Sequence, residues 1–165
     1  MPTAAFDDSI VTLYLGDSYS GFGVADMCKP TIITGQSLWP GSFFPTSQYS
    51  VPTELFYEDR GDDWIPTKMG VEAKQRASMT RWPSGMHVTH FMGHLWGLDQ
   101  PETPMPPGVD ASQAAEDYIR LLWEFVTTSG IGSVTPMGLA KGGQMWYILP
   151  VPAGVSILYI YLQYI

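Results

Sequence analysis

The most regular pattern of apolar positions lies between Ala111 and Thr128, where apolar residues recur at helical spacing. Asp110 stands at the N-cap position, and Gln113 three residues later completes the spacing of a capping box. The pattern therefore predicts an amphipathic helix over 111–128 with one buried stripe. The predicted stripe contains Ala115, Ile119, Leu122 and Val126, flanked by Ala111, Tyr118 and Phe125. The acidic residues Glu116, Asp117 and Glu124 lie off that stripe.

Short runs rich in β-branched and aromatic residues predict strands on both sides of this helix. Ser9–Leu15 is the first, and the segment after it, Gly16–Gly23, is predicted to be a loop of Gly, Ser, Asp and aromatic residues. His87–Leu98 is interpreted as a strand, because its two glycines disfavour a helix. Val71–Met79 fits either a short helix or an extended strand. Further strands are predicted at 31–34, 54–57, 144–149 and 155–165.

These elements predict a single domain over residues 1–165, in the size range of one hydrophobic core. The expected fold class is α/β of the α+β type, a mainly antiparallel sheet with one long helix packed on it. The last predicted strand, Val155–Ile165, is largely apolar or aromatic on both faces, so both faces require cover. The helix can cover one face, and a second layer or a neighbouring subunit must cover the other.

Charged side chains are missing from two long stretches of the chain. Residues 30–53 contain none, and residues 125–165 contain only Lys141. Extended uncharged surfaces usually mark interaction sites, although the core and loops of a monomer give the same pattern. Residues 30–53 are too rich in proline for a helix and are predicted to form an extended arm that packs on a neighbour. The candidate interface residues are Trp39, Phe43, Phe44, Tyr49, Tyr159 and Tyr161.

The composition excludes several classes of protein. The formal net charge is −8, from 16 acidic and 8 basic residues, which disfavours a primary nucleic-acid binder. The single cysteine, Cys28, excludes an internal disulfide scaffold. Residues 1–8 do not resemble a signal peptide, and no apolar run has the length of a membrane helix, so no membrane partner is expected.

One candidate catalytic motif is Gly16-Asp17-Ser18, directly after an apolar strand. It resembles the nucleophile block of GDSL, or SGNH, hydrolases, in which a histidine activates the serine. That family's Asp-x-x-His block has no match here, because Ser84, His87 and Phe91 stand three residues before the histidines. The chain also contains no asparagine for the oxyanion block. A tight turn after a strand explains the motif without catalysis, and we expect no enzymatic activity.

The three histidines, His87, His90 and His94, form a candidate metal site. On a helix they would share one face, as three imidazoles do around a catalytic zinc. On the predicted strand, His87 points away from the other two. We therefore expect neither a metal nor another cofactor.

The order of elements from Trp82 onward resembles one known family. The run Thr89-His90-Phe91-Met92-Gly93-His94-Leu95-Trp96-Gly97, interpreted as a strand of the form T-H-x-x-x-H-L-W-G, is followed by a proline-rich linker. An amphipathic helix, Gly-rich turns and a terminal pair of predicted strands complete the order. This resembles tail terminator proteins of long-tailed bacteriophages, also called tail-completion or neck proteins. The resemblance covers roughly the last half of the chain.

The resemblance implies a structural virion protein of the tail or neck, assembled in the host cytoplasm. In that family a small subunit forms a homo-oligomeric, hexameric ring that caps the tail tube and joins it to the head connector. DNA would pass through such a ring without sequence-specific recognition. Two alternatives remain open: a head-decoration or other minor virion protein, and a GDSL-like esterase that uses Ser18.

Overall fold

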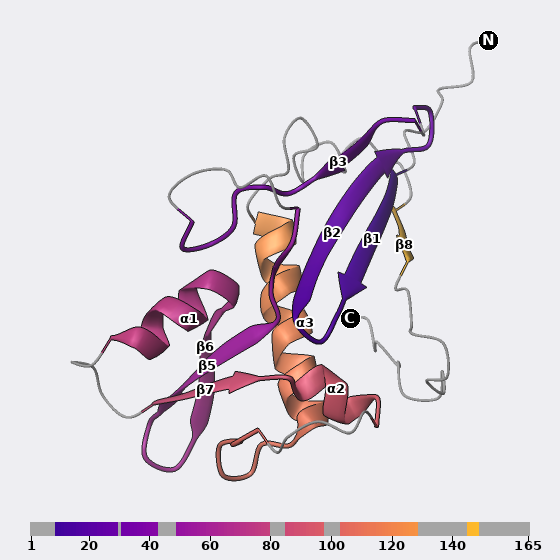
Figure 1. The fold of residues 1–165 in the computed structure, drawn as a ribbon. Helices are drawn as coiled ribbons and strands as arrows, with labels where there is room; N and C mark the ends of the chain where they lie inside the picture. The colour runs from indigo at the N-terminus through magenta and orange to yellow at the C-terminus, as the bar shows by residue number, and fades with distance from the viewer. Residues whose placement is uncertain are drawn as a thin grey trace.

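The computed structural model describes residues 9–29, 31–42, 49–79, 85–97, 103–128 and 145–148. Helix α3 (Ala111–Thr128) lies between a larger and a smaller β-sheet (Figure 1). The larger sheet has the strand order β3 (Ile33–Gly35), β2 (Tyr19–Asp26), β1 (Ser9–Leu15), β8 (Met145–Ile148), with β4 (Val51–Pro52) also paired to β2. The smaller sheet has the order β6 (Trp64–Met69), β5 (Glu54–Asp59), β7 (Gly85–Thr89). The two remaining helices are α1 (Gly70–Ser78) and α2 (Phe91–Leu95).

The fold class agrees with the sequence expectation: the structure is α+β, with mainly antiparallel pairing and one long helix. It differs in having two sheets where one was expected. Among the described strands, only β1 and β8 pair in parallel. The predicted strand Val155–Ile165 lies outside the described residues.

Strands β1 and β2 form a hairpin, closed by a bond in which the Gly16 N–H donates to the Tyr19 carbonyl over 3.0 Å. The expectation of a loop over Gly16–Gly23 is therefore wrong from Tyr19 onward. Ser20, Phe22 and Val24 alternate along β2 and are buried, which is the period of a half-buried strand. The intervening glycines masked this period in the sequence, because glycine is typical of turns.

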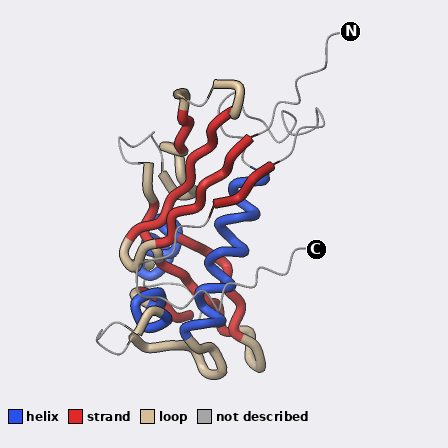
Figure 2. The backbone as a smooth tube through the Cα atoms, turned by 90° about the vertical axis from the view of Figure 1, so that its right-hand side faces the viewer, coloured by secondary structure: helices blue, strands red, loops and turns tan. Residues whose placement is uncertain are grey.

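Helix α3 has the predicted bounds and the predicted cap. The backbone N–H of Gln113 donates to a carboxylate oxygen of Asp110 over 2.8 Å, which satisfies one free donor of the first helical turn. Tyr118 and Leu122 are almost fully buried, as the stripe predicts. Asp117 is also buried, against expectation, because α3 is covered from more than one side (Figure 2).

The interpretation of His87–Leu98 as one strand is also wrong. Strand β7 ends at Thr89, and His90 has a left-handed backbone with φ of 57°. The chain then turns into the short helix α2. The alternation expected beyond Thr89 is therefore absent, and Phe91, Met92 and Gly93 are buried in succession. For Val71–Met79, the helical alternative is confirmed by α1.

Leu122 provides a direct test of the core. Its side chain is 1% exposed, so Leu122→Asp places a carboxylate among apolar groups, where an unpaired charge costs several kcal/mol. We expect this variant to lose its cooperative urea-unfolding transition, followed by circular dichroism. The control is Glu124→Ala on the exposed side of the same helix, which should unfold as the wild type does. A folded Leu122→Asp protein would mean that the helical face is assigned wrongly.

Candidate functional site

The outer face of the larger sheet, the one turned away from α3, is the strongest candidate for a functional surface. Alternation in β1 places Val11, Leu13 and Leu15 in the core. Ile10, Thr12 and Tyr14 therefore point to the outer face, where they pair in register with Ala25, Gly23 and Gly21 of β2. Ile33 of β3 lies beside Ala25 on this face.

An open groove of about 370 Å³ runs along the outer face. None of the described residues that line it carries a charged side chain. Its floor contains Gly21 and Gly23, and large side chains rise beside it: Tyr14 is 55% exposed, Tyr49 is 65% exposed and Ile33 is 74% exposed. Soluble monomers rarely expose large apolar side chains next to one another in this way. Exposed apolar patches of this kind commonly mark interaction sites.

Tyr49, one of the predicted interface residues, lies over this face. A Cβ atom added to Gly21 would lie 2.6 Å from the Tyr49 carbonyl oxygen, and one added to Gly35 would lie 2.8 Å from its ring. Both glycines therefore permit the close approach of residue 49 to the sheet. The ring of Tyr49 remains largely exposed, so its role at an interface stays a prediction.

Trp39 requires a correction, because it was expected to pack against another polypeptide. Its side chain is only 2% exposed and lies in the core, with its ring 5.5 Å from that of Phe22 and 5.6 Å from that of Phe125. The aromatic residue fills the space between β2 and the C-terminal half of α3. Its indole N–H is buried and has no hydrogen-bond partner among the residues that the structure describes.

The prediction that residues 30–53 form an arm packed on a neighbour also needs correction over residues 31–42. Part of this stretch is β3 of the larger sheet, and the carbonyl of Gly41 accepts a bond of 2.9 Å from the Gln75 side chain of α1. The backbone of β3 and Gly41 therefore pack on their own chain, whereas the side chains of Ile32, Ile33 and Leu38 stay exposed. The candidate interface residues Phe43, Phe44, Tyr159 and Tyr161 lie outside the described residues and stay predictions.

The three histidines lie in different surroundings, and two of them bond different carboxylates. His87 Nε2 lies 2.8 Å from a carboxylate oxygen of Glu54, and His90 Nδ1 lies 2.7 Å from one of Asp17. His94 lies in the last turn of α2, beside a second hollow lined by Thr103 and Met105. In the part of the chain that the structure describes, no three His, Cys, Asp or Glu side chains converge as metal ligands.

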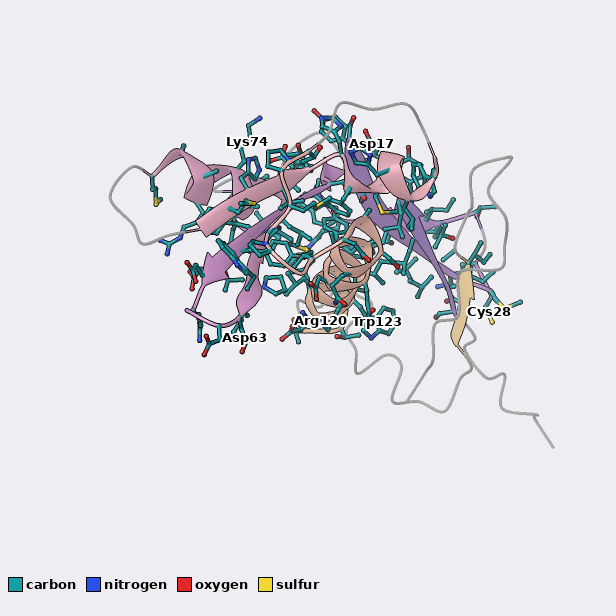
Figure 3. All side chains as sticks on the ribbon, turned by 90° about the horizontal axis from the view of Figure 1, so that it is seen from below. Asp17, Cys28, Asp63, Lys74, Arg120 and Trp123 are labelled. Atoms are coloured by element: carbon teal, nitrogen blue, oxygen red, sulfur yellow. The ribbon has the colours of Figure 1, made fainter. Side chains whose placement is uncertain are left out.

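The carboxylate of Asp17 makes two contacts with a distant part of the chain. One carboxylate oxygen bonds His90, and the other accepts the backbone N–H of Gly93 over 2.8 Å. Asp17 therefore caps α2 from a distant part of the chain, in place of the side chain of His90 (Figure 3). This contact, which we call the Asp17 latch, ties the β1–β2 turn to the end of β7. It also supports the left-handed backbone of His90, which costs about 1–2 kcal/mol for a residue with a Cβ.

The same geometry bears on the candidate nucleophile Ser18. The histidine near the Gly-Asp-Ser turn is bonded to Asp17, and the Ser18 carbonyl accepts the backbone N–H of Thr53 over 3.0 Å. A serine activated as a nucleophile needs its own hydroxyl within hydrogen-bond reach of the base. No such bond to the Ser18 hydroxyl is found among the described residues, whereas the bonds of Asp17 and of the Ser18 carbonyl hold the turn in place.

Two sets of polar contacts hold α3, one buried and one partly buried, and neither was found from the sequence. The hydroxyl of Tyr57 donates to Asp117 over 2.9 Å, and Arg120 donates to the same carboxylate over 2.9 Å. The hydroxyl of Tyr118 donates to the carbonyl of Pro52 over 3.3 Å, and burial raises the pKa of Tyr118 to about 12. Burial, followed by the bond to Asp117, also raises the pKa of Tyr57. Both tyrosines therefore stay neutral donors at physiological pH.

Comparison with known proteins assigns no family: no protein-family model matches the chain, and no curated protein matches it. None of the described helices is long and apolar enough to cross a membrane. The candidate site is therefore supported by the geometry of the outer face alone.

The Asp17 latch can be tested by Asp17→Ala. The change removes the cap of α2 and leaves the Gly93 N–H without its partner, so we expect a loss of about 1–3 kcal/mol in the free energy of unfolding. Urea denaturation followed by tryptophan fluorescence measures it. The matched control is Asp62→Ala in the exposed turn between β5 and β6, where the loss should stay within about 0.5 kcal/mol. Equal stabilities of the two variants would contradict the latch.

Proposed function

We propose that this chain is a structural subunit that assembles with copies of itself into a ring, as a tail terminator or neck protein of a bacteriophage does. The observation that carries the proposal is the uncharged outer face of the larger sheet. That face is the support for self-assembly. The position of the ring at the end of a tail tube is supported only by the sequence resemblance.

The energetics favour covering the outer face. Tyr14, Ile33 and Tyr49 are each more than half exposed, and full burial of a large apolar side chain contributes about 1.5–3 kcal/mol. Aromatic residues at the centre of an interface commonly dominate its energy. A contact over this face would therefore remove water from several large side chains at once, without burying a charge.

The overall charge supports the choice of this face for contact between copies. With a net charge of −8, two copies repel each other at most orientations. The described residues lining the groove carry no charge, so copies can meet there without placing like charges together. The same acidic character would keep DNA from adhering to a ring through which it slides.

The sequence motif that suggested the family now has a different structural basis. Thr89 ends β7, His90 forms the turn, and the following residues form α2, so T-H-x-x-x-H-L-W-G is not a strand. The support that remains for a tail protein is the order of elements around α3 and β8. A head-decoration or other minor virion protein would also have to self-associate. The shape of the assembly distinguishes this alternative from a ring-forming subunit.

Self-assembly can be tested by placing charge on the outer face. Ile33→Lys and Tyr14→Glu should shift the protein from oligomer to monomer in native mass spectrometry, because each contact would bury an unpaired charge. The control is Ile65→Lys on the smaller sheet, which should keep the wild-type mass. Electron microscopy of the wild type should show closed rings. A monomeric wild type at all concentrations would refute the proposal.

The esterase alternative is tested with Ser18. We expect no hydrolysis of short-chain p-nitrophenyl esters by the wild type, and Ser18→Ala should leave both this rate and the oligomer mass unchanged. The reason is that, among the residues the structure describes, no hydrogen bond joins the Ser18 hydroxyl to a histidine that could act as its base. Ester turnover that disappears in Ser18→Ala would instead favour an enzyme.

A further inference from the structure

We draw no further inference here: the strongest candidate, the uncharged groove on the outer face of the larger sheet over β1, β2 and β3, carries nothing beyond the proposed function, because nothing in the structure shows what covers it.

Discussion

The structure depends on the burial of α3 between two sheets. Adjacent residues of this helix reach in different directions: the hydroxyl of Tyr118 bonds the carbonyl of Pro52 in the larger sheet, while Asp117 accepts the hydroxyl of Tyr57 from the smaller sheet. Each bond is worth about 1–3 kcal/mol when its loss would leave a buried partner unsatisfied. Together with the apolar stripe around Leu122, they join the two sheets through the helix. The position and rotation of the helix therefore determine which sheet faces are buried.

The chain passes from one sheet to the other at Thr53, and the polar contacts concentrate there. The hydroxyl of Thr53 lies 2.6 Å from that of Ser20, and its backbone N–H bonds the Ser18 carbonyl. The Asp17 latch joins the same hairpin turn to α2. Asp17 and Ser18, which resemble a nucleophile block in sequence, thus help to hold the two sheets together. Buried polar pairs of this kind favour one arrangement of the sheets, because any other leaves donors unsatisfied.

This arrangement leaves the outer face of the larger sheet without a cover among the described residues. Alternation along β1 and β2 sends the bulky side chains of Val11, Leu13 and Phe22 inward, and it sends glycine and a few large exposed residues outward. A face of this composition is poorly matched to water and poorly matched to charged partners. It is well matched to another uncharged surface, which is the physical basis for the self-association proposed above.

The sequence by itself determined α3 to its end residues, because a helix repeats its apolar period over several turns and Asp110 supplies a local cap. It also determined β1, whose residues have strong β propensity. Only the tertiary structure decided that β2 is a strand, since its glycines lie at outward positions that local propensity misreads as a loop. The same holds for the turn at His90, which depends on Asp17, far away in the chain. Trp39 shows most clearly what local sequence cannot predict. The absence of charged residues near it predicted an interface with another polypeptide, but its side chain is buried in the core of its own chain. Local patterns report periodicity and capping, whereas which apolar residue is covered, and by what, depends on contacts between distant segments.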